Sequence, residues 1–427
     1  MFLPKRIVSF IDSITEKSLP AHSALSEEEQ YTPPTFAEGD QEEPIESSSD
    51  GSYLIKIDDP TQKICFGAFL DGVQRTIAWK YIPTSCGALV PIHLAHIGVL
   101  AILRRESGEL FIEPELRASR ILILGPFEGL RRAGVHIEEL DEVGRDVLLD
   151  TDNRTFAFPP HLDEWVICDT TYCGTDPNRG NQTEGALLGD AMFNEGLIRS
   201  RAQGRVATLR QRLEFAVLAR LRRLHPSMWV IVDGPLFFIE KWRQRAANVL
   251  IRELGEANQE LVEDKLLINA VGIIKGQRLK PKHPDQIIKM DLAQRSLVVP
   301  LSYEVDIDGR RDTHDEQGRY GGMHFTWYTR LRGRSIPPYG LLGLIRLDIH
   351  RVSLPGLVRA DALTKQDFKQ YSPLIDSITW SIWHERWPGF RRKDDFRTAS
   401  TLYPIWQVEK ICKSMLFPRR YLAYFNL

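Results

Sequence analysis

"FGAFLDG" at residues 66–72 and "WVIVDGPL" at residues 229–236 share one design. In each stretch, a run of strand-forming apolar residues is followed by an aspartate and then a glycine. A single Asp-Gly pair after a strand is most often a turn. Two such pairs can also be two halves of one metal site, because carboxylate oxygens are the ligands that hard divalent cations prefer. Asp71 and Asp233 are therefore the first candidate functional residues.

The composition is that of an ordinary globular protein. The chain has 427 residues, 43% hydrophobic and 26% charged, with a formal net charge of −2, so it is long enough for one elaborated domain or two. Five cysteines without a CxxC pair indicate a reducing compartment, and the Cys168–Cys173 pair lacks partners at zinc spacing. The most apolar run, 88–103, is too short to cross a bilayer. We expect a cytoplasmic protein without a membrane segment or secretory signal.

Charge is spread unevenly along the chain. Residues 27–50 contain nine acidic and no basic side chains, so the remainder has more basic than acidic residues and can present basic surfaces locally. An acidic segment rich in Ser and Pro buries too little apolar surface to offset its ordering entropy. The sequence therefore predicts a largely flexible N-terminal region over 1–54 and one folded domain over 55–427.

Hydrophobic periodicity predicts the elements that carry the two aspartates. We expect three strands at 63–70, 74–82 and 88–103 in an antiparallel meander, then a helix within 114–133 and a long loop over 150–185. A long helix over 186–224 should end before His225-Pro226. Its apolar stripe comprises Val206, Leu209, Leu213, Val217, Leu221 and Leu224.

The second half should alternate strands and helices. We expect a strand at 228–232 that leads to Asp233, a helix at about 237–262, and an apolar strand over 266–276 that exits on Lys275. Later strands are predicted in "SLVVPLSYEVDI", "MHFTWYTRL" and "GLIRLDIH", and residues 360–427 should be helical with an aromatic-rich loop.

The order of these elements matches the skeleton of the RNase H-like nuclease fold, an α/β fold with a mixed central sheet flanked by helices. In that skeleton, carboxylates from the first strand, a helix and the fourth strand converge on divalent metals. Here these positions are Asp71, Glu214 and Asp233. At 100° per residue, Glu214 lies at the edge of the buried helix face, where a carboxylate can lean over a sheet end. Such metals activate water and neutralise charge on a scissile phosphate.

At these residues the chain resembles the NurA nuclease family. "FLDGVQR" is similar to the family's first Asp-Gly-Ser segment, and Glu214 lies nineteen residues before Asp233, as the family's helix glutamate does. Further blocks with this resemblance are "WVIVDGPL", "AVGIIKGQR", "TWYTRL" with "GLIRLDI", and "LYPIWQVEKI". They extend over residues 64–412, and their order and spacing carry the resemblance.

The resemblance implies a DNA nuclease that uses Mn²⁺ or Mg²⁺. It also implies a homodimer that processes double-strand-break ends together with a HerA-type hexameric ATPase. Metal ligands would be Asp71, Glu214 and Asp233. The sequence departs from the family pattern in two places: Val73 replaces the serine after Asp-Gly, and Glu409 stands where the final helix usually carries a metal-binding histidine. Glu409 is therefore a fourth candidate metal ligand.

Several side chains have both a functional and a structural interpretation. Arg75, Lys275 and Arg210 are candidate DNA contacts, and Glu214 could instead form an ion pair with Arg210 one turn earlier. Asp348 is better explained by pairing with Arg346 or Arg351. The aromatic stretch 379–390, with His384, favours core or dimer packing over base stacking. The arginines of the long helix fit a DNA track, a solvated face or a partner surface equally: Arg199, Arg201, Arg205, Arg210, Arg212, Arg220, Arg222 and Arg223.

The departures from the family pattern leave a second function open. A nuclease-like protein that is weakly active or inactive could bind DNA or serve as a scaffold partner of an ATPase. An RNA-directed or defence-associated nuclease is a third possibility, because the fold does not decide the substrate sugar.

Overall fold

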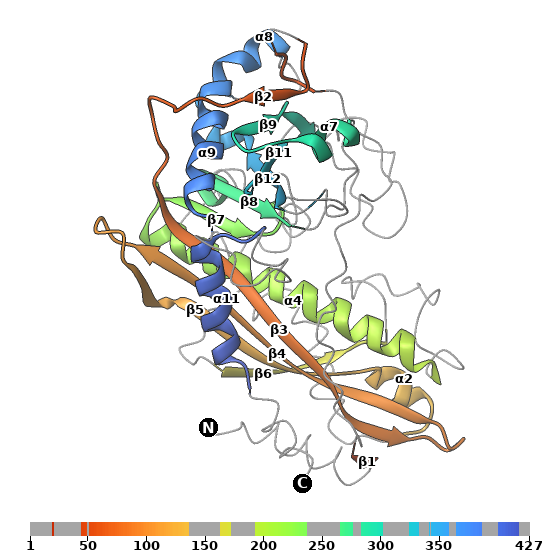
Figure 1. Cartoon of the computed structure of the whole chain (residues 1–427). Helices are drawn as coiled ribbons and strands as arrows, with labels where there is room; N and C mark the ends of the chain where they lie inside the picture. Colours follow the sequence, from red (N-terminus) through yellow and green to blue (C-terminus); the bar gives the residue numbers. More distant parts are fainter. Residues whose placement is uncertain are drawn as a thin grey trace.

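The structure is a computed structural model in which a long mixed β-sheet is covered by helices (Figure 1). It describes residues 19–20, 44–48, 51–135, 163–171, 193–236, 265–275, 283–301, 324–332, 341, 343–357, 364–386 and 400–417. Within these ranges, no helix is both long and apolar enough to cross a membrane. The expected α/β class with a mixed sheet flanked by helices is confirmed.

The twelve strands of the described part belong to one sheet. Its main path runs β2-β9-β11-β12-β8-β7-β3-β4-β5-β6, while β1 pairs with β3 and β10 with β11. The pairs β3/β7, β7/β8 and β5/β6 are parallel and the others antiparallel. The strands are β1 (Leu19–Pro20), β2 (Leu54–Lys56), β3 (Phe66–Pro83), β4 (Leu89–Arg104), β5 (Leu110–Gly125), β6 (Asp163–Asp169), β7 (Trp229–Asp233), β8 (Ala270–Ile274), β9 (Gln294–Ser296), β10 (Val299–Leu301), β11 (His324–Arg330) and β12 (Leu344–His350).

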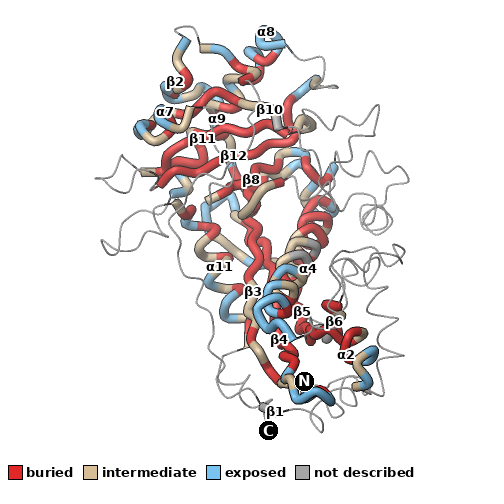
Figure 2. Tube along the Cα trace, turned by 90° about the vertical axis from the view of Figure 1, so that its right-hand side faces the viewer, coloured by how far each residue is buried: buried red, intermediate tan, exposed pale blue. Residues whose placement is uncertain are grey.

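Helices lie on both faces of this sheet. They are α2 (Phe127–Arg132), α4 (Glu195–Leu224), α7 (Pro284–Lys289), α8 (Lys365–Phe368), α9 (Ser372–His384) and α11 (Tyr403–Met415), with short 3₁₀ turns at Arg351–Ser353 and Lys369–Tyr371. Figure 2 shows α4 and α11 on opposite sides of β3 and β4. Each face of the central strands therefore has its own helix.

The side chains of β3 alternate between these two faces. Ala68 and Leu70 pack in the core cluster that contains the apolar stripe of α4. Phe69 and Val73 pack in a second cluster with α9 and the buried residues of α11. Every residue of the predicted α4 stripe is buried except its last, Leu224, which is 38% exposed.

The first three strands differ from the expectation in length. A single strand, β3, covers most of 63–70 and all of 74–82, because the chain continues through the Asp-Gly pair while it pairs with β4. The helix expected within 114–133 is wrong for most of its length: residues up to Gly125 belong to β5, and only Phe127–Arg132 is helical. Pairing with β4 on one side and β6 on the other outweighs local helix propensity there.

Other expectations agree with the structure. α4 ends at Leu224, and β7, β8, β11 and β12 lie where strands were predicted. The loop expected over 150–185 is wrong at Asp163–Asp169, because these residues form β6, a parallel neighbour of β5. The helix expected at about 237–262 lies outside the described residues. The aromatic stretch begins inside α9, where Trp383 is 6% exposed and its Nε1–H donates to Thr329, so packing is the correct interpretation for this residue.

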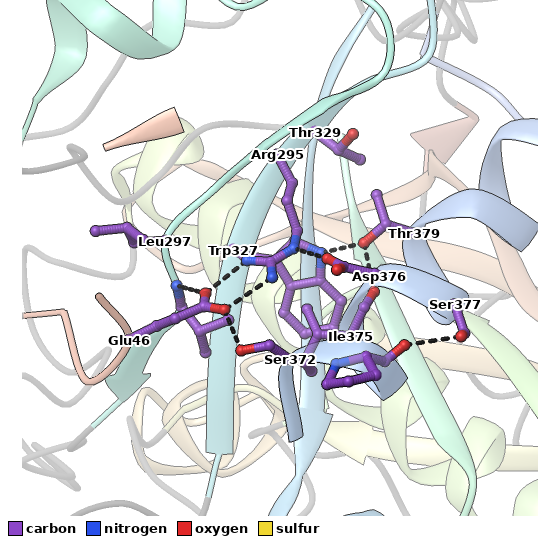
Figure 3. A network of polar contacts seen from close by, with 12 residues as sticks. Glu46, Arg295, Leu297, Trp327, Thr329, Ser372, Ile375, Asp376, Ser377 and Thr379 are labelled. Atoms are coloured by element: carbon purple, nitrogen blue, oxygen red, sulfur yellow. Dashed lines mark hydrogen bonds and ion pairs between the residues drawn. The ribbon is translucent and has the colours of Figure 1, made fainter. Parts of the chain in front are cut away.

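A buried ion-pair network ties the chain near residue 46 to the sheet (Figure 3). Arg295 on β9 is fully buried, and its guanidinium donates to both carboxylate oxygens of Glu46 at 2.6 and 2.8 Å. The same guanidinium donates to Asp376 on α9 at 2.6 Å. Ser372 Oγ and the Val298 N–H also donate to Glu46. Ordered packing therefore begins before the expected boundary at residue 55, and Tyr53 is buried as well.

Candidate functional site

The sheet register brings the two Asp-Gly motifs side by side. Leu70 of β3 is level with Val232 of β7 in a parallel pair, so Asp71 and Asp233 follow at the same height on neighbouring strands. Strand β7 ends at Asp233, whereas β3 continues and pairs Asp71 with Leu100 of β4. The first aspartate is thus in the middle of a strand, at the point where that strand loses its β7 neighbour.

The glycines after the two aspartates have different structural roles. Gly234 has a φ of +124°, a backbone conformation that favours glycine. Gly72 instead provides space: a Cβ there would lie 2.3 Å from Oε1 of Glu214. The carboxylate of Glu214 therefore lies over Gly72, on the α4 face of β3. The N–H of Gly72 also donates to Oδ1 of Asp71 at 2.7 Å.

Gly72→Ala should displace the Glu214 carboxylate without strain in the backbone of β3. The clash is with the end of a flexible side chain, so we expect a small loss of stability but about a 10- to 100-fold loss of metal affinity or activity. Gly67→Ala is the matched control, because the three atoms nearest to its Cβ would all belong to the flexible side chain of Met228. Metal titration and thermal melting of both variants test this, and equal metal affinities would contradict it.

Burial and repulsion between charges raise the pKa values of two carboxyl groups in this region. Burial raises the pKa of Asp71 well above its usual range, and the Asp233 carboxylate raises it further, against the lowering effect of Lys275. Burial also raises the pKa of Glu214 to about 7, against the lowering effect of Arg210. Oε1 of Glu214 is buried and accepts no hydrogen bond from the described residues, with Arg210 Nη1 at 3.4 Å. The region thus concentrates negative charge in a poorly solvated place.

Lys275, the residue after β8, is the nearest cation to these aspartates among the contacts that the structure describes. Its Nζ lies 2.6 Å from Oδ2 of Asp233. Burial acts against the charge of Lys275, but Asp233 and Asp71, with a smaller contribution from Glu409, raise its pKa overall. The predicted strand exit on Lys275 is confirmed, and its partner in this structure is a carboxylate.

Helix α11 contributes the remaining groups. Glu409 forms an ion pair with Lys413 at 2.5 Å, one turn further along the helix. Cys412 lies against the backbone of Asp71, its Sγ 3.9 Å from the carbonyl oxygen. Burial and the charges of Asp71 and Glu214 raise the pKa of this thiol well above its usual range, so it stays protonated and is unsuited to be a ligand. Its proximity could not be read from the sequence, where it is one member of a buried helical stripe.

The predicted ligands approach the site from two faces of the sheet. By strand alternation, Asp71 and Asp233 share the α11 face with Phe69 and Ile231, whereas Glu214 comes from α4 across Gly72. In the described part of the chain, no three His, Cys, Asp or Glu side chains are grouped closely enough to hold a metal ion as they stand. The donor chemistry nevertheless fits Mg²⁺ or Mn²⁺, because all candidate ligands are carboxylates and one buried oxygen lacks a hydrogen bond.

The candidate DNA contacts and several of the helix arginines bind other groups of the protein. Arg75 donates to the carbonyl of Phe417, and Arg210 to that of Gly72 at 2.7 Å. Arg222 is buried, and its guanidinium donates hydrogen bonds to the backbone carbonyls of Leu266 and Met228, so its role is structural. Arg220 and Arg223 both lie near Glu115. Whether the other arginines contact DNA stays a prediction.

Three further expectations concern neighbouring side chains. Asp348 is buried, accepts from Thr326 and pairs with Arg346 at 3.2 Å, so its structural interpretation is confirmed. Val73 is buried in the core cluster of α11. His384, expected to be packed, is exposed at the end of α9, and its Nδ1 lies 2.9 Å from the carbonyl of Trp380.

A comparison of the chain with models of known protein families finds no match, and a comparison with curated proteins finds none either.

Proposed function

We propose that this protein is a metal-dependent nuclease with an RNase H-like fold, of the NurA type, which hydrolyses phosphodiester bonds in DNA. The observation that carries the proposal is the pairing of β3 with β7, which sets Asp71 and Asp233 side by side where β7 ends. In the proposed biological setting, the enzyme works as a homodimer with a HerA-type ATPase on double-strand-break ends.

The topology supports the fold part of this proposal. The central strands lie in the order β5-β4-β3-β7-β8. Strands β5, β3, β7 and β8 run in one direction, and β4 runs in the opposite direction. The first strand of this unit, β3, is thus central and adjacent to β7, the strand in the fourth position of the skeleton, and α4 precedes β7 in the chain. An RNase H-like skeleton needs this adjacency, because its carboxylates come from the first and fourth strands.

The side chains present suggest separate roles in hydrolysis. Asp71 and Asp233 would hold a divalent ion, with Glu409 on α11 a further candidate carboxylate. When bound, such an ion activates water and neutralises charge on the scissile phosphate. Glu214, with a pKa of about 7, lies on the α4 face across Gly72 and is suited to exchange a proton at neutral pH. Lys275 carries the positive charge that would face an anionic substrate.

The rate of cleavage should depend on the protonation of Glu214. Its deprotonated form is the one that can accept a proton or bind a metal, so activity should rise with pH. Given a pKa of about 7, we expect an increase of close to tenfold per pH unit below about pH 6.5 and a plateau above about pH 8. In the Glu214→Gln variant, activity should no longer rise with pH over this range. A wild-type profile that is flat from pH 5.5 to 8 would contradict the assignment.

The direct test of the function uses the purified full chain. Linear DNA is incubated with the protein in the presence of Mn²⁺, Mg²⁺ or a chelator, with RNA of the same sequence in parallel and with or without a HerA-type ATPase. We expect metal-dependent degradation of DNA that the chelator abolishes. Cleavage of RNA alone would change the substrate class, and absence of cleavage under every condition would overturn the proposal.

A second candidate function is a nuclease-like scaffold that binds DNA or an ATPase without cleaving. The observation that favours it is the Lys275–Asp233 ion pair, which occupies a carboxylate that the nuclease needs for its metal. The buried Val73 next to the motif is consistent with it. DNA binding without metal-dependent cleavage would select this alternative.

A further inference from the structure

Lys275 forms an ion pair with Asp233, and the charges of Asp71 and Glu409 also act on it. Its ammonium is 2.6 Å from Asp233, and the charges that act on it most are those of Asp233, Asp71 and Glu409. These acids come from β7, β3 and α11, elements far apart in the sequence. The side chain of Lys275 is 28% exposed, so the ammonium is placed where ions from solvent can also arrive.

An ammonium and a divalent cation make similar demands on such a site. Both need negatively charged oxygens, and a lysine ammonium is a compact, strongly hydrated point charge. They differ in geometry, since Mg²⁺ needs oxygens at about 2.0–2.1 Å, closer than a nitrogen–oxygen contact permits. Carboxylates arranged around an ammonium therefore do not yet form a closed metal site, which agrees with the absence of a ready three-ligand group among the described residues.

We infer that Lys275 is a built-in competitor of the divalent cation: its ammonium occupies the cation's place in the metal-free protein and must leave Asp233 before a metal binds. This inference rests on the metal site of the proposed function. It accounts for the contact of 2.6 Å between the Lys275 ammonium and a carboxylate that the metal would need. It also gives Lys275 a second position after metal binding, free of Asp233 and next to the place of an anionic substrate.

A purely structural lysine would behave differently on removal. If Lys275 only stabilised the carboxylates in their positions, its loss would misplace them and weaken metal binding. If it competes for them, its loss removes both the ion pair that the metal must break and a like charge beside the metal. The sign of the change in metal affinity therefore separates the two roles.

Calorimetric titration with Mn²⁺ at pH 8 provides the first test. We expect Lys275→Met to bind Mn²⁺ about tenfold more tightly than the wild type, although the variant cleaves DNA more slowly. Lys410→Met is the matched control, because Lys410 lies on α11 beside Glu409 but is directed over the Trp406 ring. The control should bind Mn²⁺ as the wild type does. Unchanged or weaker binding by Lys275→Met would overturn the inference.

A second test needs no variant and so does not depend on the folding of Lys275→Met. Amine acylation of the wild-type chain, read by peptide mass spectrometry, reports how accessible each lysine is. We expect Mn²⁺ to increase the labelling rate of Lys275 at least about threefold, because an ion-paired ammonium is released. Lys63, an exposed lysine paired with Asp59, is the internal reference. Labelling that falls or stays constant with Mn²⁺ would contradict the inference.

The outcomes distinguish this inference from the proposed function. Equal Mn²⁺ affinity of the wild type and Lys275→Met would overturn the competition and leave the metal site intact. If neither protein binds Mn²⁺, the metal site fails, and the inference fails with it. Tighter binding by Lys275→Met with faster labelling of the wild type in Mn²⁺ supports both.

Discussion

Asp71→Asn should lower metal-dependent DNA cleavage by about 10³-fold or more, the size of effect expected when a group at the reacting centre is lost. The variant removes one negative oxygen ligand and leaves the shape of the side chain nearly unchanged. The same change should raise the thermal stability of the metal-free protein. Burial and the Asp233 charge raise the pKa of Asp71, so its ionised form destabilises the fold at neutral pH and a neutral amide does not.

The stability part of this prediction has a definite sign. A carboxyl with a folded-state pKa above its unfolded value stabilises the fold at low pH, and this stabilisation is lost as the pH rises through the folded pKa. The gain in stability of Asp71→Asn should therefore be larger at pH 8 than at pH 5. Melting curves at both pH values, without metal, provide the measurement.

Asp169→Asn is the matched control. Asp169 also ends a strand, β6, and burial raises its pKa too, but its Oδ1 accepts from the N–H and hydroxyl of Thr171 on the far side of the sheet. An asparagine can accept the same hydrogen bonds, so cleavage should stay within about threefold of the wild type. Full activity in Asp71→Asn, or equal losses in both variants, would remove Asp71 from the proposed site.

Glu46→Ala should cost about 3–5 kcal/mol of stability, the usual result of removing one partner from a buried ion pair. The change leaves Arg295, which is fully buried, with Asp376 as its remaining acidic partner in the network of Figure 3. It also removes the acceptor of the Ser372 hydroxyl and of the Val298 N–H. Urea unfolding followed by tryptophan fluorescence is a suitable measurement, because Trp327 lies beside this network.

Glu109→Ala provides the comparison for Glu46→Ala. Glu109 pairs with Arg105 at 2.9 Å, but both side chains are more than half exposed, so the pair should add almost nothing to stability. A similar effect of the two substitutions would show that the buried network does not hold residues 44–48 to the sheet. A large effect of Glu46→Ala alone would extend the folded unit to include them.

Local pattern predicted much of the secondary structure. The stripe of α4 and the apolar runs of β7, β8, β11 and β12 have clear periodicity, and each forms the expected element. The helix expected within 114–133 is wrong up to residue 125 because "EPELRASR" has a helix-compatible composition, while its strand conformation depends on β4 and β6, which are distant in the sequence. The Asp-Gly pair at Asp71 was misread as a strand end for a similar reason: β4 keeps β3 extended through it.

The sequence by itself determined which carboxylates are candidates and the order in which strands and helices present them. Those properties depend on residue type and on short-range periodicity, which are local. Only the tertiary structure decided that Asp71 and Asp233 are level on adjacent strands, that Glu214 lies on the opposite face across Gly72, and that Lys275 pairs with Asp233. Strand register and the choice of face come from contacts between distant segments, and a period of two or 3.6 residues does not encode them.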